Sequence, residues 1–533
     1  MQAPPKAYSQ YCKDLTQQEQ STVSVKKEAL LRIALVFPNT YEVGMSNLGF
    51  QEVYRLFNAY DFVSCERVFL LPPPFHTQHY SLESGRILSD FDVIAFSVSF
   101  ELDIPNVLTI IKNVQINLQS SKRNPREPLV ICGGVITMLN PTPLAPFIDV
   151  FLLGEAQSLI NQFLECLFEN RGNGFRSQAC LHQLAQNPAF WVPKITAANS
   201  EHKIIRKDER QQPIQSSLIS SKSHFKDMHL IEVGRACSRG CRFCAACFIY
   251  QPTRFYSMEQ IIEAAKINPF KTSRIGLVGS ALSDFPQLHE LCRKLSDEDF
   301  QLGLSSFRLD MISPEFLKIL ENAGVKSLTL APEAGSERLR NIIHKQISDE
   351  QIFEAINALN TSSISIVKFY FLIGLPFETK PDIEAIIYLI SKIRAILNRS
   401  ISISVSINAF IPKPRTPFQW FELAPEKEIK QKRKFLTQEL RKIPRVQVVP
   451  KSTKTEILQA LFSQGSEKIS PLLRDFVEKK QKWNQILNQH AQFISPIIFE
   501  RKEFEQKLPW DFLQTNINKN GLIKIAKKVS GKN

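Results

Sequence analysis

The chain has 533 residues, of which 43% are hydrophobic and 22% charged, and these values predict a soluble protein of two to four domains with ample core. No apolar run approaches the length of a membrane helix, and residues 1–30 lack the apolar core of a secretory signal, so we expect a cytoplasmic protein. The net charge of +14 is compatible with a nucleic-acid or phosphate-bearing partner but does not require one. Much of the excess lies in 427–445, where a solvated helix face explains it.

Residues 1–30 are expected to form a leader or an arm that packs on an edge. From 31 to 195, short apolar runs alternate with helical patterns, which predicts βαβ units and a Rossmann-like parallel sheet. The strand candidates are 32–38, 92–98, 128–132 and 150–153. Ligands of such sheets bind at the carboxyl ends of strands, where Ser97, Gly133 and Gly134 lie, although a tight turn also explains the two glycines.

Residues 196–225 are polar and are expected to connect two domains, with an exposed hairpin among them. Between 226 and 445 the alternation of strands and helices restarts, and six strand candidates predict a partial (β/α)6 barrel. The candidates are 229–233, 274–278, 301–305, 327–330, 365–372 and 402–410. Residues 446–533 are expected to form a small helical extension. The predicted fold class is α/β, with functional residues at the carboxyl ends of the strands.

Ten cysteines occur, and seven of them are scattered through a chain without a secretory signal, which favours reduced thiols. The other three, Cys237, Cys241 and Cys244, form a C-x3-C-x2-C array after the first strand of the predicted barrel. Thiolates select soft metals or iron–sulfur clusters. With Cys247 as a fourth ligand the array would suit a structural zinc ion or an electron-transfer cluster. Structural zinc usually joins two separated ligand pairs, and no second pair occurs here, which disfavours zinc. With three cysteine ligands a [4Fe–4S] cluster would leave one iron open, and Cys247 would be an incidental small residue or a nearby thiol with its own role.

The array, with Phe243 directly before its third cysteine, resembles the cluster motif of the radical S-adenosylmethionine (SAM) enzymes. The stretch 331–340 is similar to a Pro-Glu-Ala-Gly-Ser-Glu motif of the radical SAM branch that includes methylthiotransferases and cobalamin-type enzymes. Two earlier stretches, 37–49 and 133–155, resemble the cobalamin-binding-type domain that precedes many radical SAM cores. Together with the tail 508–511, they make nearly the whole chain similar to an uncharacterised family in which such a domain precedes a radical SAM core.

This resemblance implies an enzyme that binds a [4Fe–4S] cluster and SAM. An electron from a low-potential donor of the flavodoxin or ferredoxin type would cleave SAM, and the resulting 5′-deoxyadenosyl radical would abstract a hydrogen from the substrate. Cys237, Cys241 and Cys244 would be the cluster ligands, and Phe243 would lie near the adenine. The sequence assigns no catalytic residue and does not indicate the substrate.

Further strand-end residues match the SAM pocket that the resemblance implies. Gly279 and Ser280 stand where relatives place a turn for the SAM ammonium group, but the usual Glu is absent and a helix cap is an equal alternative. Ser305 and Arg308 would hold the ribose or the carboxylate, with an ion pair between Arg308 and Asp310 as the alternative.

Three later positions complete that implied pocket. Glu333 would meet the ribose or the ammonium group of SAM. Lys368, in an otherwise apolar strand, either points into the barrel or snorkels outward. Gly374 and Pro376 belong to a Gly-x-Pro turn whose backbone would lie against the adenine.

The N-terminal domain departs from the cobalamin-binding pattern in two places. The Asp-x-His-x-x-Gly signature is absent, and the usual Gly-Glu-Gly-Glu sequence is replaced at 154–157 by Gly-Glu-Ala-Gln. Two interpretations therefore stay open. The domain binds cobalamin without a histidine ligand, at the strand ends that carry Ser97, Gly133 and Gly134, or it keeps the fold without the cofactor.

The leading hypothesis is a radical SAM enzyme, with cobalamin-assisted methyl transfer or rearrangement among its outcomes. Modification of RNA by an enzyme of the methylthiotransferase type is the first alternative, but no second three-cysteine set lies upstream for its auxiliary cluster. A non-enzymatic sensor that binds a cluster or a corrin is the second alternative, and the intact cysteine array argues against it.

Overall fold

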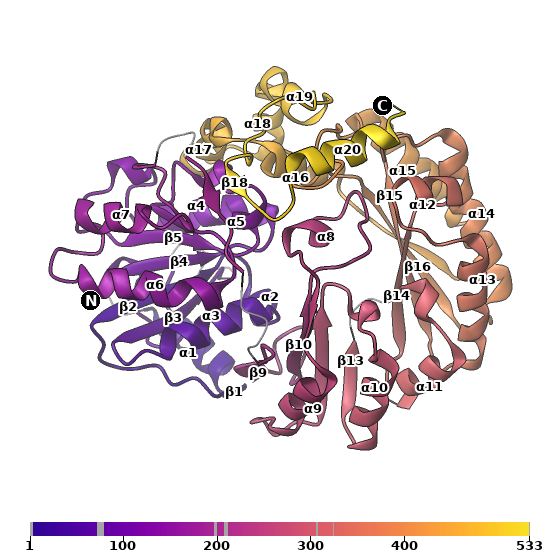
Figure 1. The fold of residues 1–533 in the computed structure, drawn as a ribbon, viewed down its shortest axis with the longest axis horizontal. Coiled ribbons are helices and arrows are strands. Elements are labelled where there is room, and N and C mark those ends of the chain that lie inside the picture. Colours follow the sequence, from indigo (N-terminus) through magenta and orange to yellow (C-terminus); the bar gives the residue numbers. More distant parts are fainter. Residues whose placement is uncertain are drawn as a thin grey trace.

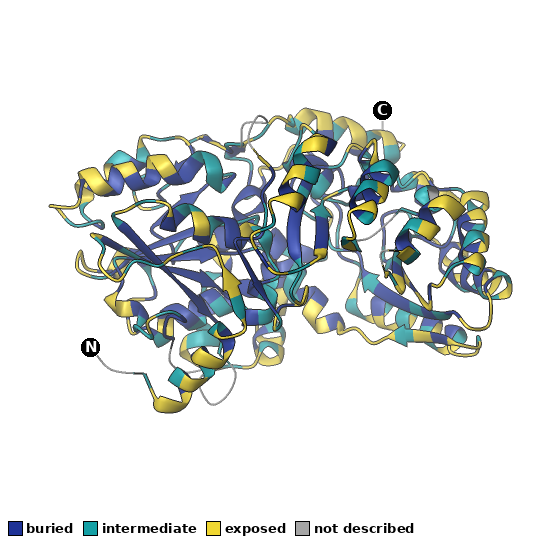
Figure 2. Cartoon of the chain, turned by 90° about the horizontal axis from the view of Figure 1, so that it is seen from below, coloured by how far each residue is buried: buried dark blue, intermediate teal, exposed yellow. Residues whose placement is uncertain are grey.

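The computed structural model describes residues 4–71, 79–196, 200–206, 212–304, 308–322 and 324–531. Two α/β units lie side by side, and the C-terminal segment, coloured yellow, lies along the top of both (Figure 1). The strands of the N-terminal unit are mostly buried, those of the second unit mix buried with more exposed residues, and the helices of both units present exposed residues on their outer faces (Figure 2). Within the described ranges, none of the helices combines the length and the apolar composition that a membrane crossing requires.

Six strands form the N-terminal sheet in the order β3-β2-β4-β5-β6-β7, and all except β7 run parallel. They are β2 (Leu31–Phe37), β3 (Val63–Phe69), β4 (Val93–Ser97), β5 (Leu129–Gly133), β6 (Val150–Leu152) and β7 (Phe190–Trp191). The main helices are α2 (Tyr41–Gly44), α3 (Leu48–Asn58), α4 (Ile104–Asn113), α5 (Ile136–Leu139), α6 (Ala156–Glu169) and α7 (Gln178–Ala185). The predicted Rossmann-like sheet is confirmed. Its strand order reverses between β2 and β4, and sheets of this type bind ligands at such a switch point.

An N-terminal arm packs onto this unit. Helix α1 (Lys6–Thr16) buries Tyr8, Cys12 and Leu15 in the N-terminal core. After it, β1 (Glu19–Ser21) pairs antiparallel with β9 (Leu218–Ser220). The hairpin expected within 196–225 does not form in the part described, because β8 (His202–Lys203) and β9 each pair with a distant strand.

The second unit contains two four-stranded sheets, β11-β10-β12-β13 and β14-β15-β16-β17, in which only β11 is antiparallel. The first holds β10 (His229–Arg235), β11 (Arg254–Phe255), β12 (Arg274–Gly279) and β13 (Gln301–Leu304). The second holds β14 (Ser327–Glu333), β15 (Ile366–Ile373), β16 (Ser402–Ala409) and β17 (Val446–Val449). All six predicted strands are present. The seventh parallel strand, β17, extends the second sheet past the boundary expected at 445.

Helices cover the outer face of these two sheets and leave the inner face more polar. They are α9 (Met258–Lys266), α10 (Leu288–Asp297), α11 (Pro314–Asn322), α12 (Glu337–Ile342), α13 (Asp349–Ala358), α14 (Lys380–Ile396) and α15 (Glu426–Leu440). Strand β15 shows the reason: buried Val367, Phe369 and Phe371 join the helical core, whereas Lys368 and Tyr370 alternate with them on the other face.

The C-terminal segment ties the two units together. It contains α16 (Thr453–Gln464), α17 (Ser470–Glu478), α18 (Trp483–Gln489), α19 (Ala491–Ile498), β18 (Leu513–Gln514) and α20 (Lys519–Val529). Helix α17 packs against α4 of the N-terminal unit, and β18 pairs with β8. Nearby, Asn140 Nδ2 donates a hydrogen bond to the Gly465 carbonyl oxygen at 2.7 Å, and Lys413 Nζ lies 2.6 Å from a Glu101 carboxylate oxygen.

Candidate functional site

The cysteine array forms the loop that follows β10, at the carboxyl end of the first barrel strand. The chain leaves the strand through Ala236, whose φ of 68° lies in the left-handed region that non-glycine residues seldom adopt. Cys241 is buried, Cys237 and Cys244 are partly exposed, and the short helix α8 (Ala246–Ile249) begins directly after the array. The three thiols thus lie at the strand end where this fold places its functional groups.

A fourth thiol, that of Cys247, lies close to the other three. Its proximity is the main cause that lowers the pKa of Cys237, Cys241 and Cys244, the last to about 7, and the same proximity raises the pKa of Cys247 itself. Within the described ranges, no three His, Cys, Asp or Glu side chains meet in the geometry of a single metal ion. A cubane cluster holds its thiolates on separate corners, so it does not need such a meeting point.

The loop is anchored by side chains from several elements. The carboxylate of Asp284, beyond the end of β12, accepts a hydrogen bond from Arg239 Nε at 2.8 Å and lies 3.8 Å from the Cys237 thiol. On the other side, His344 Nδ1 contacts the Arg239 carbonyl oxygen at 2.9 Å. Gln251 Nε2 donates to the Cys237 carbonyl oxygen, also at 2.9 Å. These hydrogen bonds fix the backbone of the loop that carries the thiols.

Glu333, at the end of β14, brings a carboxylate to the same region. Its φ is 69°, and Lys345 Nζ lies 3.4 Å from its Oε1 atom. Burial raises the pKa of Glu333, while Lys345 opposes the shift. The same two charges act on the array, because Lys345 lowers the pKa of Cys241 and Glu333 raises that of Cys244. Arg308 reaches this cluster through Nη2, which lies 3.5 Å from the Lys345 carbonyl oxygen.

The Gly374 turn is fixed by a buried ion pair. Gly374 has a φ of 74°, and a Cβ there would lie 2.8 Å from the Ala424 Cβ, so both the conformation and the space favour glycine. The Gly374 amide donates to both carboxylate oxygens of Glu378, at 2.9 and 3.0 Å, and Lys432 Nζ lies 2.5 Å from the same carboxylate. Pro376 is buried beside this turn.

The remaining predicted SAM residues have different surroundings. Phe243 packs partly buried against the core beneath the cysteine loop. Lys368 is exposed on the inner face but pairs in register with Thr329, four residues before Glu333, so it lies well below the strand ends. Ser305 lies outside the described residues, as does the side chain of Asp310.

A cavity of about 400 Å³ separates the two units, and four predicted residues line it: Ser97, Gly134, Gly279 and Ser280. Ser97 ends β4 and Gly134 follows β5 of the N-terminal sheet, whereas Gly279 ends β12 of the barrel and Ser280 follows it. Asn47, whose Nδ2 donates to Ser99 Oγ at 3.2 Å, lies beside Ser97 at the switch point. We call this space the interdomain cavity.

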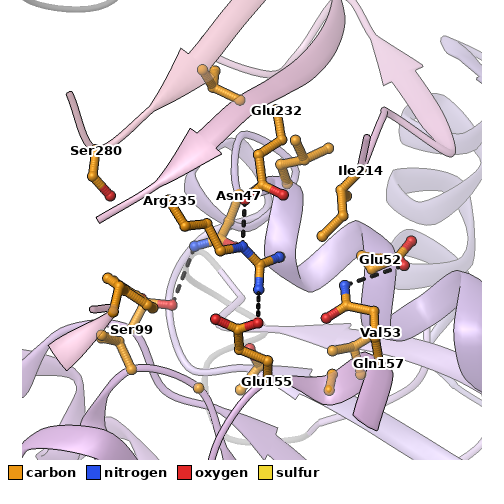
Figure 3. A pocket seen from close by; sticks show the side chains of 18 of the residues that line it. Asn47, Glu52, Val53, Ser99, Glu155, Gln157, Ile214, Glu232, Arg235 and Ser280 are labelled. Atoms are coloured by element: carbon orange, nitrogen blue, oxygen red, sulfur yellow. Dashed lines mark hydrogen bonds and ion pairs between the residues drawn. The ribbon is translucent and has the colours of Figure 1, made fainter. Parts of the chain in front are cut away.

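Charged side chains cross the interdomain cavity (Figure 3). Arg235 Nη1, at the end of β10, lies 2.7 Å from the Glu155 carboxylate of the N-terminal unit. Arg254 Nη2 lies 2.6 Å from the same carboxylate, and Arg235 Nε lies 2.6 Å from Glu232. The Glu155 side chain is only 2% exposed. A buried carboxylate thus holds two arginines of the barrel against the N-terminal unit.

The structure requires glycine at only one position of the Gly133-Gly134 pair. Gly134 has a φ of 93°, and a Cβ there would lie 2.5 Å from the Val98 carbonyl oxygen, so close approach of the chain to itself requires this glycine. A Cβ at Gly133 would meet nothing within 4 Å.

Two family descriptions match the chain: "Radical SAM proteins, N-terminal" over residues 49–193 and "Radical SAM superfamily" over residues 231–390. An uncharacterized protein of Methanocaldococcus jannaschii is 30% identical over 452 residues, which cover 83% of this chain and 90% of that protein. The chain belongs to the radical SAM superfamily. It is a radical SAM enzyme, as the sequence predicts, and its N-terminal unit matches the N-terminal domain of radical SAM proteins.

This radical SAM enzyme is similar to further proteins. The anaerobic magnesium-protoporphyrin IX monomethyl ester cyclase of Rubrivivax gelatinosus is 23% identical over 284 residues, which cover 50% of this chain and 49% of the cyclase. The structure of the cobalamin-dependent SAM radical enzyme OxsB with aqua-cobalamin bound matches at 12% identity and a TM-score of 0.49, over 70% of this chain and 53% of OxsB. With SAM also bound, OxsB matches at 10% identity and a TM-score of 0.48, over 94% of this chain and 79% of OxsB.

Membership of the superfamily implies a [4Fe–4S] cluster, SAM, a reductant and a substrate.

Sequence reasoning missed several residues that surround the array in this radical SAM enzyme. Cys247 lies close to the three thiols, and its exclusion from the ligand set stays a prediction. Asp284 bonds to Arg239 of the loop and Lys345 pairs with Glu333, and no local sequence pattern predicts either contact. Only the fold brings these side chains to the loop.

Proposed function

We propose that Cys237, Cys241 and Cys244 hold the [4Fe–4S] cluster and leave one iron for SAM. When bound, the cluster supplies the electron that cleaves SAM and so generates a radical that abstracts hydrogen from a substrate. The observation that carries the proposal is the place of the three thiols, which lie at the carboxyl end of β10 in a loop braced by Asp284. The donor set fits, because soft thiolates are the ligands that iron–sulfur clusters take.

The surroundings of the loop support this assignment. Behind it lies a largely apolar core, which includes Trp420, Trp510 and Leu522 and packs with the buried Cys241. In front of it, Glu333 and Lys345 supply a carboxylate and an ammonium group. A zwitterionic amino acid moiety needs both signs of charge to be oriented. We therefore propose that the Glu333 carboxylate contacts the ammonium group or the ribose of SAM. Lys345 neutralises the charge of Glu333.

Gly374 and Arg308 have proposed roles that follow from their bonds. Because Glu378 occupies the amide of Gly374, the turn is rigid and presents its outer surface to the adenine. Arg308 approaches the Glu333–Lys345 pair and would meet the SAM carboxylate or ribose. Phe243 would contact the adenine from the loop itself. Lys368 lies too far down β15 to join them, so we assign it to the substrate side of the inner face.

The interdomain cavity fits a small molecule rather than a whole corrin. A volume of about 400 Å³ is at the lower end of the range for drug-sized ligands, and a corrin with its nucleotide tail is far larger. The ion pairs of Glu155 also cross the space between the strand ends. We therefore derive no step through cobalamin and propose that the N-terminal unit serves the barrel as a docked cover with a small-ligand cavity.

We propose a low-potential flavodoxin or ferredoxin as the reductant. We also propose a cytoplasmic location, because an oxygen-labile cluster needs a reducing compartment. Modification of RNA is not favoured, because the chain lacks a second three-cysteine set upstream of the array.

Anaerobic reconstitution with iron and sulfide, followed by reduction in the presence of SAM, tests the proposal. We expect 5′-deoxyadenosine from the full-length protein, and loss of both the cluster absorption and this product in Cys237→Ala. Cys292→Ala is the matched control, because Cys292 is a buried cysteine of α10 outside the array. A Cys237→Ala protein with normal iron content, or a wild-type protein that forms no 5′-deoxyadenosine, would contradict the assignment. Incubation with hydroxocobalamin should leave the visible spectrum that of the cluster alone.

A further inference from the structure

A second cavity, of about 440 Å³, lies behind the cysteine loop. On one side it is lined by Phe248 and Ile249 of α8, the helix that follows the array. On the other side lie Arg415, Gln419 and residues of the stretch 510–522, which runs from Trp510 into α20. Figure 1 shows α20 lying above α8 at this place. We call this space the C-terminal cavity, and it shares no lining residue with the interdomain cavity.

Arg415 brings a buried positive charge to the C-terminal cavity. Only 8% of its surface is exposed, and its φ of 63° is in the left-handed region. Its Nη2 atom donates to the carbonyl oxygens of Trp510 and Leu513, both at 2.8 Å. Among the described residues, its Nε atom is buried without an acceptor, and no carboxylate forms an ion pair with the guanidinium. The two carbonyl bonds fix the side chain but do not neutralise its charge.

The neighbouring charges do not compensate Arg415. Asp511, the acidic residue that lines the cavity, lies 2.7 Å from Lys519 Nζ and is engaged by that ammonium group. Arg206, whose Nη2 donates to the Ile249 carbonyl oxygen at 3.4 Å, adds a second positive charge nearby. Burial and Arg206 lower the pKa of Arg415 to about 10, with Asp511 opposing the shift. A buried cation without an anionic partner is costly, which points to an anion that the chain does not itself supply.

The start of α20 adds to this electrostatic bias. The helix has 11 residues, its cap Asn518 and its first residue Lys519 line the cavity, and no acidic residue occupies its first turn. The positive end of the helix dipole therefore faces the same space as Arg415. Asn516 and Asn518 are exposed at the cavity and present amide groups that hydrogen-bond to oxyanions.

We propose that the C-terminal cavity binds a small ligand through a phosphate or carboxylate group that lies against Arg415 at the start of α20. The guanidinium is held ready by two main-chain carbonyls, so it needs no reorganisation to meet the anion. Because Phe248 and Ile249 of α8 form one wall, the ligand lies beside the helix that follows the array, and Glu333 is not among the lining residues. The site is distinct from the proposed SAM pocket.

Hydrogen–deuterium exchange on the full-length protein tests this site with inorganic phosphate, malonate and chloride as probes at equal ionic strength. Phosphate or malonate should slow exchange of the backbone amides in 508–524, and chloride should not. Protection by phosphate alone identifies a phosphate ligand, by malonate alone a carboxylate ligand, and by both a site for either group. Exchange that neither oxyanion changes, or that chloride changes equally, would overturn the proposal.

Three variants complete the experiment. Arg415→Gln should weaken oxyanion binding about tenfold or more, because it removes the charged donor. Asn516→Asp is the second variant if Arg415→Gln fails to fold, since Asn516 is exposed; its new charge should weaken binding about fivefold at a contact distance in water. Lys434→Gln, in a separate basic groove beside α15, should leave binding unchanged. Undiminished protection in both pocket variants, or an equal loss in Lys434→Gln, would contradict the site.

Discussion

The ion pairs of Glu155 allow a quantitative test of how the two units are joined. Glu155→Gln keeps the shape of the side chain but removes its charge, which leaves the guanidiniums of Arg235 and Arg254 without the carboxylate at 2.7 and 2.6 Å. Removing one partner of a buried pair typically costs about 3–5 kcal/mol. The two arginines are 16% and 12% exposed, and Arg235 keeps Glu232 at 2.6 Å. We therefore expect the lower end of that range, about 3 kcal/mol in the free energy of unfolding.

Urea denaturation followed by tryptophan fluorescence and circular dichroism measures this loss. The matched control is Glu298→Gln, which removes the carboxylate of an ion pair with Lys266 at 2.7 Å whose side chains are 50% and 49% exposed. Such an exposed pair contributes at most about 1 kcal/mol. If Glu155→Gln lowers the unfolding free energy no more than Glu298→Gln does, the buried carboxylate does not hold the units together and the reasoning fails.

Three further predictions concern single side chains. Burial, with a smaller contribution from Glu101, raises the pKa of Asp103 from 3.8 to about 6, so the folded state holds this proton more tightly than the unfolded state. The free energy of unfolding should then fall as pH rises from about 4 to about 6, and chemical denaturation across that window should show a flatter profile for Asp103→Asn. Glu378→Gln should weaken SAM binding about tenfold without loss of cluster absorption, because it removes a charged hydrogen bond to the Gly374 turn. Unchanged SAM affinity in equilibrium dialysis would contradict the proposed contact between this turn and the adenine. Cys247→Ala should retain the cluster's iron content, which loss of iron comparable to that in Cys241→Ala would disprove.

The sequence was sufficient for the α/β class, for most parallel strands of both units and for the superfamily, because apolar runs and motif spacing are local signals. Strand β3 was missed for a physical reason. Its polar residues Ser64, Glu66 and Arg67 interrupt the apolar pattern, yet the whole strand is buried. Arg67 is tolerated there because it forms ion pairs with Glu19 and Glu83, at 2.8 and 2.6 Å. Partners so distant in the chain cannot be read from a local window.

In the candidate site, too, local motifs predict some residues, whereas contacts between distant parts of the chain could not be predicted. The array and the strand ends that carry Glu333 and Gly374 follow from motifs, and their roles stay predictions. The motifs could not show that Cys247 lies close to the other thiols, because its spacing allows a residue either inside or outside the array. They also grouped Lys368, a residue within its strand, with the SAM pocket, whereas the register of β14 and β15 sets it four positions below Glu333.

The core behind the cysteine loop has a consequence for biosynthesis. It combines Cys241 and Cys247 with Leu508, Trp510, Leu522 and Ala526, which leave the ribosome long after the loop does. Domains generally fold from the N-terminus during synthesis, so the Rossmann-like sheet can be complete while the back of the loop is still uncovered. Until α20 docks, the thiols are open from behind. That interval leaves the array accessible from the side that α20 covers in the finished protein.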